Sequence, residues 1–218
     1  MKLPPLLLVV VAGAAWLYWQ YQRPGAGASA TAQARRLRSP LVRLAELLGI
    51  QTARGRQAQR WARGAEGERR TAARLRPLAR AGWTVLHDRA LPTGRANIDH
   101  LLVSPSGIVI VLDSKNWSAY PLRIASGRLI YGDRDVTDWL NGIRHEARTV
   151  SRLLECPVIP LVSMEGARIV GSELVLDGIR IVPADQVVSV LRALARRHRA
   201  VGEHPGRRAA ALFVPKDH

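Results

Sequence analysis

Two apolar strands joined by a short turn are the feature of this sequence that most constrains its fold. The stretch IDHLLVSPSGIVIVLDSKN runs from residue 98 to residue 116. Its aliphatic segments, residues 97–103 and 108–115, contain the residue types that favour strands, and SPSG between them supplies turn residues. The pattern therefore predicts a tight antiparallel hairpin.

The hairpin should bring three charged side chains together. If Ser104 pairs with Ile108, then Asp99 pairs with Asp113, and directly opposed residues share one face of a sheet with Cβ atoms ~5 Å apart. Lys115 shares that face because side chains alternate along a strand. His100 should face the other side, where a packing role is expected, and a slip of one residue would disperse the cluster.

Opposed carboxylates repel each other, and the arrangement becomes favourable when a divalent cation lies between them. Mg²⁺, with Mn²⁺ as a substitute, fits because it binds through one or two carboxylates plus water and phosphate oxygens. Such an ion activates water and polarises a phosphoryl group, and Lys115 would stabilise the developing charge. Asp99 and Asp113 are thus predicted metal ligands of a phosphodiesterase, although a DxK triplet alone also fits a solvated salt bridge.

These residues also carry a family resemblance. Asp99 followed by Asp113-x-Lys115 resembles the D…(D/E)xK signature of the restriction-endonuclease-like nucleases. The wider pattern of GAEGER (64–69), WTVLHD (83–88), ANIDHLLVSPSG (96–107) and VLDSKNW (111–117) resembles the nuclease-related domain (NERD) family. The resemblance implies a nuclease fold, DNA as the substrate, and a catalytic, metal-binding role for Glu68.

Two positions depart from the family pattern. The family usually has glutamate where this chain has Asp113, a shorter carboxylate that the wider superfamily accepts. It also tends to carry glutamine on the helix after the core strands, where this chain offers only Asn141 nearby. Asn97 shares the face of Asp99 and is a second candidate accessory residue, whereas His87 and Asp88 are interpreted as structural.

Periodicity along the rest of the chain predicts an α/β (α+β) fold, with a restriction-endonuclease-like mixed central sheet flanked by helices and preceded by a transmembrane helix. The expected organisation has four parts: an anchor at 1–22, a linker and basic amphipathic helix at 23–56, the nuclease-like domain at 57–183, and a C-terminal helix and basic tail at 184–218. Residues 24–34 read as a flexible linker, and disorder is expected after residue 200.

The anchor prediction rests on residues 3–21, an almost uncharged run of the length needed to cross a bilayer, with Trp and Tyr at its C-terminal end. Arginines after the run predict a single-pass membrane protein with its domain in the cytoplasm, which agrees with a lone cysteine, Cys156. The alternative is a cleaved signal peptide, with Ala28-Ser29-Ala30 as the cleavage site.

The charge balance indicates anionic partners. The chain has 33 lysine and arginine residues against 17 aspartate and glutamate residues, a formal net charge of +16. DNA or another nucleic acid and an anionic membrane surface are therefore the predicted partners. Arg144, Arg148 and Arg152 recur every fourth residue and predict either a nucleic-acid-binding stripe or a solvated face. The helix around residues 37–48 either lies on anionic lipid or packs on the domain.

The sequence thus favours a membrane-tethered, Mg²⁺-dependent endonuclease with no small-molecule cofactor. One alternative keeps the nuclease fold as a non-catalytic nucleic-acid-binding or membrane-surface module, and another is a scaffold for envelope proteins. The sequence does not indicate an oligomeric state.

Overall fold

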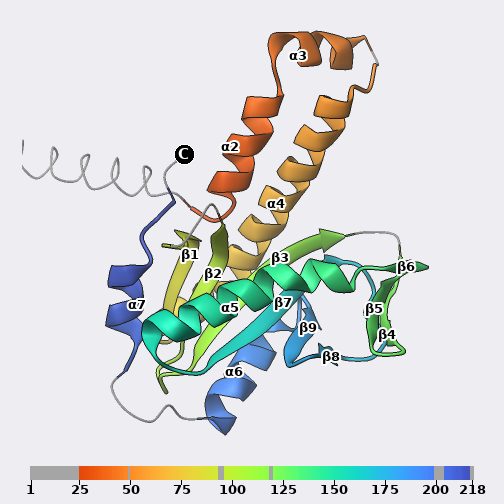
Figure 1. The fold of residues 1–218 in the computed structure, drawn as a ribbon. Helices are drawn as coiled ribbons and strands as arrows, with labels where there is room; N and C mark the ends of the chain where they lie inside the picture. The colour runs from red at the N-terminus through yellow and green to blue at the C-terminus, as the bar shows by residue number, and fades with distance from the viewer. Residues whose placement is uncertain (1–24, 49, 93–95, 118–119, 199–203, 217–218) are drawn as a thin grey trace, which may run out of the picture.

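A six-stranded mixed sheet forms the centre of the molecule in a computed structural model that describes residues 25–48, 50–92, 96–117, 120–198 and 204–216 (Figure 1). The strand order is β1-β2-β3-β7-β9-β8, and a small antiparallel sheet has the order β4-β5-β6. The predicted α/β class with a mixed sheet flanked by helices is confirmed. The strands are β1 (Thr84–Ala90), β2 (Asn97–Val103), β3 (Val109–Trp117), β4 (Leu122–Ala125), β5 (Arg128–Tyr131), β6 (Arg134–Asp135), β7 (Val158–Gly166), β8 (Leu174–Leu176) and β9 (Ile179–Pro183).

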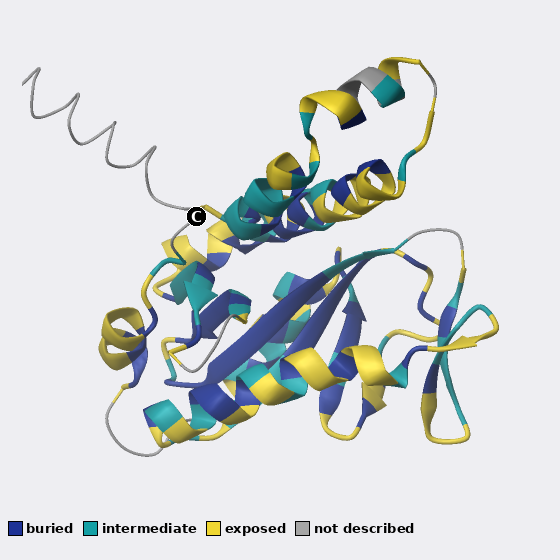
Figure 2. Ribbon diagram, turned by 45° about the horizontal axis from the view of Figure 1, so that its top comes forward, coloured by how far each residue is buried: buried dark blue, intermediate teal, exposed yellow. Residues whose placement is uncertain are grey.

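Helices cover both faces of the central sheet, so its middle strands are buried on both sides (Figure 2). On one face, α5 packs its apolar side, which includes Ile143 and Val150, against β3 and β7. On the other face, Leu75 of α4 and Leu191 of α6 belong to a second apolar cluster. The helices are α2 (Ala28–Leu37), α3 (Pro40–Leu47), α4 (Ala53–Arg80), the 3₁₀ helix η1 (Thr137–Leu140), α5 (Asn141–Leu154), α6 (Val187–Arg197) and α7 (Gly206–Leu212).

The central hairpin has the predicted register. Ser104 N donates to Ile108 O at 2.9 Å, and His100 pairs with Leu112 in the antiparallel ladder of β2 and β3. Continued by one residue, this register sets Asp99 opposite Asp113. The parallel pairing of β3 with β7 then fixes the hairpin in the middle of the sheet.

The expected flexible linker at residues 24–34 is wrong, because most of it belongs to α2, which runs alongside α4 (Figure 1). Small residues allow the close approach. A Cβ added to Gly27, where φ is +76°, would lie 2.6 Å from Ala65 O, and Ala30 is buried. A run of alanines that looks like a linker in sequence thus forms a packed helix.

The disorder expected after residue 200 is also wrong for much of the tail. Helix α7 packs beside β1, and Phe213 is completely buried. Ala90 N donates to Val214 O at 3.0 Å, which fixes the end of the tail to the edge strand. The signal for this contact was the apolar run AAALFV at residues 209–214, which contains Phe213.

Smaller differences concern element ends. The sequence predicts a helix over residues 57–81 with a kink or an end near Pro77, but helix α4 continues through the proline to Arg80. The sequence pattern also predicts a short strand at residues 167–170, where the structure has only an isolated bridge between Ile169 and Leu122; it does not predict β6 or β8.

The predicted anchor at residues 1–22 lies outside the described residues. Within the part of the chain that the structure describes, no helix is long and apolar enough to cross a membrane. The alternative cleavage site, Ala28-Ser29-Ala30, lies in the first turn of α2.

Candidate active site

The carboxyl-terminal half of β3 carries the centre of the candidate site. Lys115 Nζ lies 2.8 Å from Asp113 Oδ1 and 2.7 Å from Oδ2, so the ammonium group spans both carboxylate oxygens. Asp99 Oδ2 accepts a hydrogen bond of 2.9 Å from Ser114 N, which closes the end of the hairpin where the backbone ladder stops. The three predicted residues are therefore brought together on adjacent strands.

Glu68 reaches the same place from α4. A Cβ added to Gly67 would lie 2.9 Å from Asn116 Cβ, so only glycine lets the helix approach β3 this closely. The next residue, Glu68, is 7 % exposed, and its Oε2 has no hydrogen-bond partner among the described residues. Burial, together with repulsion from Asp88 and Asp113, raises the pKa of Glu68 to about 7.

A fourth acid, Glu146 on α5, was missed in the sequence. Burial and repulsion from Asp113 raise the pKa of Glu146 to about 8, and Lys115 opposes the rise. Glu146 lies one position before the buried Ala147 and one turn before the buried Val150, so it borders the apolar side of the helix. An acid at that border, facing the DxK strand, was the available signal. The predicted accessory Asn141 instead donates to Asp138 and accepts from Arg144.

The charges of this cluster do not balance. Burial, followed by repulsion from Glu68 and Asp113, raises the pKa of Asp99 well above its ordinary value. Burial disfavours the charged form of Lys115, but Asp113 and Asp99 outweigh it and raise the pKa of the ammonium group. Four carboxyl groups thus share one cation, so the fully ionised cluster carries a net charge of −3 (+1 against −4).

A divalent cation fits this excess of buried negative charge, and the orphaned Glu68 Oε2 offers it an acceptor. Within the described ranges, however, no three His, Cys, Asp or Glu side chains converge closely enough to form a metal-binding group. Mg²⁺ commonly binds through one or two carboxylates and fills its remaining positions with water. The donor set therefore suits Mg²⁺ better than ions that require a closed protein cage.

Asp88 and Asn97 form a second polar group beside Glu68. Asp88 is fully buried with a φ of +48°, and it accepts hydrogen bonds from Ser29 N at 2.7 Å and from Asn97 Nδ2 at 2.9 Å. Asn97 therefore contacts Asp88 rather than the acids of β3. Because Asp88 also repels Glu68, a residue interpreted as structural contributes to the electrostatics of the site.

The opposite face of the hairpin carries a buried chain of hydrogen bonds. His100 Nε2 lies 3.1 Å from Ser114 Oγ, and the Nδ1 atoms of His87 and His100 are 2.8 Å apart. Burial lowers the pKa of His87 to about 4 and that of His100 well below its ordinary value. The prediction that His100 is a packing residue on the face opposite Asp99 is confirmed.

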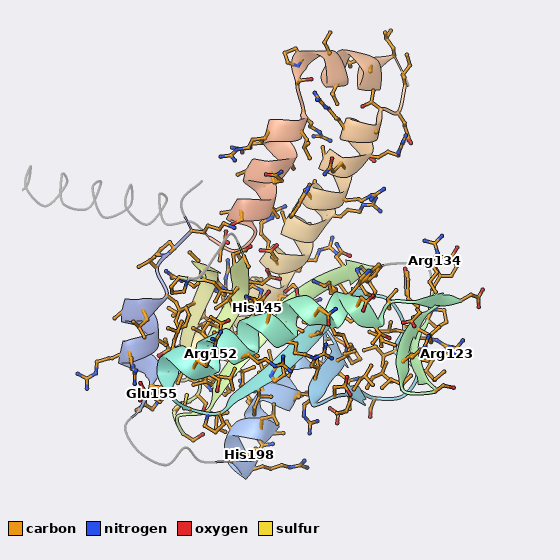
Figure 3. All side chains as sticks on the ribbon, viewed as in Figure 1. Arg123, Arg134, His145, Arg152, Glu155 and His198 are labelled. Atoms are coloured by element: carbon orange, nitrogen blue, oxygen red, sulfur yellow. The ribbon has the colours of Figure 1, made fainter. Side chains whose placement is uncertain are left out.

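This pair makes a specific prediction for stability in acid. Because His87 has a folded-state pKa below its unfolded value near 6.5, the unfolded chain binds more protons between pH 6.5 and 4. The contribution of His87 to the free energy of unfolding is therefore lost as the pH falls from 6.5 to 4. We expect His87→Gln to reduce the loss in unfolding free energy between pH 7.5 and pH 5.0 by about 2 kcal/mol, measured by urea denaturation. The exposed His145 on α5 gives the control His145→Gln, and an equal pH dependence in both variants would contradict the assignment (Figure 3).

The predicted arginine stripe lies on the flank of α5 away from Glu146. Arg144 and Arg148 line a surface pocket of about 420 Å³ together with Ser151 and residues of β7 and β9. Arg144 also forms an ion pair of 3.0 Å with Asp177. Arg152 points to solvent (Figure 3). Their role in nucleic-acid binding stays a prediction.

The fold and the site together define a nuclease-like α/β domain, in which a helix glutamate joins an acidic hairpin ending in DxK. Residues 63–164 match the family model described as the nuclease-related domain, NERD. The match begins in α4 just before Glu68 and ends in β7, so it includes every acid of the site. This segment, slightly less than half of the chain, is thus similar to the nuclease-related domain family, and the similarity suggests a nuclease-related function. Neither the curated proteins nor the solved structures contain a significant match.

Proposed function

We propose that the protein is a metal-dependent nuclease that hydrolyses phosphodiester bonds of DNA. The observation that carries the proposal is the gathering of Glu68, Asp99 and Asp113 around Lys115, in a segment that matches a nuclease-related family. Buried acids whose pKa values are strongly raised, beside one specific cation, are typical of functional sites. Mutual repulsion between the carboxylates would not stabilise a purely structural cluster.

One or two carboxylates from the set Asp99, Asp113 and Glu68 would hold the metal, with water in its other positions; Mg²⁺ is preferred, and Mn²⁺ is a substitute. When bound, the ion would supply Lewis-acid activation of the scissile phosphate and of water. Lys115 stays protonated, held by Asp113, and places a positive charge where the attacked phosphate becomes more negative. Glu146, on the helix that covers this end of β3, would accept a proton from the attacking water when its carboxyl group is ionised, which the pKa of about 8 favours at alkaline pH.

The direct test uses the full chain with supercoiled plasmid. We expect conversion to the nicked form with Mg²⁺ or Mn²⁺ and none with EDTA. A protein that binds DNA in EDTA but never cleaves it with metal would instead be the non-catalytic module. Absence of both binding and cleavage would favour the scaffold alternative and contradict the proposal.

A second feature favours attachment to an anionic membrane surface. Leu41, Leu47, Leu48 and Ile50, at the tip of the α2–α4 hairpin, are 78 %, 84 %, 69 % and 57 % exposed. The surrounding sequence, residues 28–63, contains eight arginines and one acid, Glu46. The arginines are Arg35, Arg36, Arg38, Arg43, Arg54, Arg56, Arg60 and Arg63. Apolar side chains among cations match the boundary of anionic lipid headgroups and acyl chains.

We therefore propose that residues 3–21 anchor the chain, with the domain on the cytoplasmic side, and that the tip rests on the same membrane. In a chain that starts at residue 25, we expect Leu41→Gln/Leu47→Gln to lower cosedimentation with anionic phosphatidylglycerol vesicles at least tenfold, because each leucine buries apolar surface in lipid. Val175 and Val214, 49 % and 56 % exposed elsewhere, provide the matched double control. Circular dichroism would verify that each shortened variant is folded. Equal losses in both double variants, or equal binding to neutral vesicles, would contradict the tip assignment.

A further inference from the structure

Four aromatic residues gather at the end of β3, next to the candidate active site. We call this group the aromatic platform; it consists of Trp117, Tyr120, Tyr131 and Trp139. The described part of the chain contains only three other Phe, Trp or Tyr residues: Trp61, Trp83 and Phe213. The platform residues come from β3, the segment before β4, β5 and η1, so the fold brings them together from separate segments.

The platform is partly exposed. The ring centroids of Trp117 and Trp139 are 4.1 Å apart, those of Trp117 and Tyr131 are 5.1 Å apart, and those of Tyr120 and Tyr131 are 5.5 Å apart. Trp117 and Tyr131 also pack against the main apolar cluster. By contrast, Trp139 is 49 % exposed and Tyr120 is 59 % exposed. The inner pair thus fixes the platform to the core, and the outer pair offers aromatic surface to a ligand.

The platform continues the face of the sheet on which the candidate active site lies. Trp117 follows Lys115 by two residues on β3, so the two side chains share a face, and a two-residue step along a strand is ~6.6 Å. Trp139 lies in η1, which leads directly into the helix that carries Glu146. A strand whose phosphate lies at Lys115 would therefore bring its neighbouring bases to the platform.

Backbone contacts hold the platform in place. Gly132 has a φ of +60°, and a Cβ at this position would lie 3.2 Å from Tyr120 Cγ, so the ring rests against the glycine. Leu122 N donates to Arg168 O at 2.8 Å, which ties the small sheet to the segment after β7. A surface that is already ordered loses little conformational entropy when a ligand binds.

The charges around the platform suit phosphates only moderately. Arg123 and Arg134 lie on the small sheet (Figure 3), and Arg168 lies beside it. These three arginines form no ion pair among the described residues, but Asp133 and Asp138 share the surface. Stacking, rather than charge, must therefore provide most of the selectivity. Bases within a duplex are already stacked on their neighbours, whereas unpaired bases have free faces for aromatic side chains.

We propose that the aromatic platform stacks unpaired bases, so that the preferred substrate is a single-stranded or locally unpaired nucleic acid. This inference rests on the proposed nuclease function, which explains why the platform lies next to the DxK strand. The alternative occupant, an apolar protein segment, is an outcome of the test below.

The test measures binding of the full chain in EDTA, so that a failure of catalysis does not affect it. A labelled oligothymidylate and a duplex of equal length serve as probes. We expect tighter binding of the single strand, and Trp139→Ala should weaken it about tenfold while changing duplex binding less than about twofold. Trp139→Phe, which keeps a stacking ring, should restore most of the affinity, and Tyr120→Ala should repeat the loss.

Trp61→Ala is the matched control, because Trp61 is 42 % exposed on α4. We expect it to leave single-strand binding unchanged. Equal binding of strand and duplex, an equal loss with Trp61→Ala, or full affinity in folded Trp139→Ala would each overturn the proposal and leave a protein segment as the occupant. Metal-dependent cleavage of the single strand that is insensitive to Trp139→Ala would keep the nuclease function and still overturn the proposed role of the platform.

Discussion

Replacing Asp113 by asparagine is expected to lower metal-dependent DNA cleavage by roughly 10²–10³-fold. The substitution removes a negative oxygen that would bind the metal, and it releases Lys115 Nζ, which lies 2.7 Å from Asp113 Oδ2. In the proposed nuclease both groups would act where charge develops in the transition state, so the loss should fall on kcat. The measurement is the rate of plasmid nicking at saturating Mg²⁺, followed over the concentration of DNA.

Two further variants make this prediction specific. Lys115→Met should lose cleavage to a similar extent and keep most of the metal binding, because it removes the cation and leaves the acids in place. Asp185→Asn changes the net charge by the same amount as Asp113→Asn at an exposed position in the turn before α6, and it should cleave like the wild type. If Asp113→Asn keeps more than about a tenth of the wild-type rate, Asp113 has no role in catalysis.

Replacing Glu146 by glutamine is expected to stabilise the metal-free protein at alkaline pH. Its folded-state pKa of about 8 lies above the ordinary value of 4.5, so the folded state binds more protons between these values. The stability contributed by this group is therefore present in acid and lost as the pH rises through 8. We expect the advantage of Glu146→Gln over the wild type to grow by about 2–3 kcal/mol between pH 5.5 and pH 9.

Urea denaturation in EDTA at the two pH values measures this change. Asp133→Asn, an exposed acid without an ion pair among the described residues, should show no such growth. Mg²⁺ should stabilise the wild type more at pH 9 than at pH 5.5, since the acids that would bind it are then ionised. If Glu146→Gln is destabilised equally at both pH values, Glu146 has a packing role, and the proposed repulsion between Glu146 and Asp113 is contradicted.

The central hairpin could be predicted because its information is local. A turn of fixed length sets the register of the two strands beside it, and the register sets which side chains share a face. Asp99, Asp113 and Lys115 are therefore placed by residues no more than nine positions from the turn. Glu68 was predicted as a site residue only from the family resemblance, because nothing in the local sequence of α4 indicates which strand the helix approaches.

The predictions that were wrong or missing concern features that local sequence does not determine. Residues 28–37 contain alanines that fit a linker or a helix equally well, and packing against α4 decides for the helix. The tail after residue 200 has a short apolar run at residues 209–214 between charged residues, and the burial of Phe213 beside β1 fixes this run in place. Glu146 was overlooked because its role depends on how α5 is rotated above β3. Each of these features depends on a contact between residues distant in sequence.

The sequence by itself determined the alternation of strands and helices, the register of the acidic hairpin and the family of the segment around it. Only the tertiary structure decided that four acids share one lysine, that burial lowers the pKa values of His87 and His100, and that Trp117 and Trp139 meet beside the DxK strand. The physical reason is that burial and repulsion act through space. Charges from α4, β2, β3 and α5 perturb each other only after the sheet and its covering helices have brought them within a few ångströms.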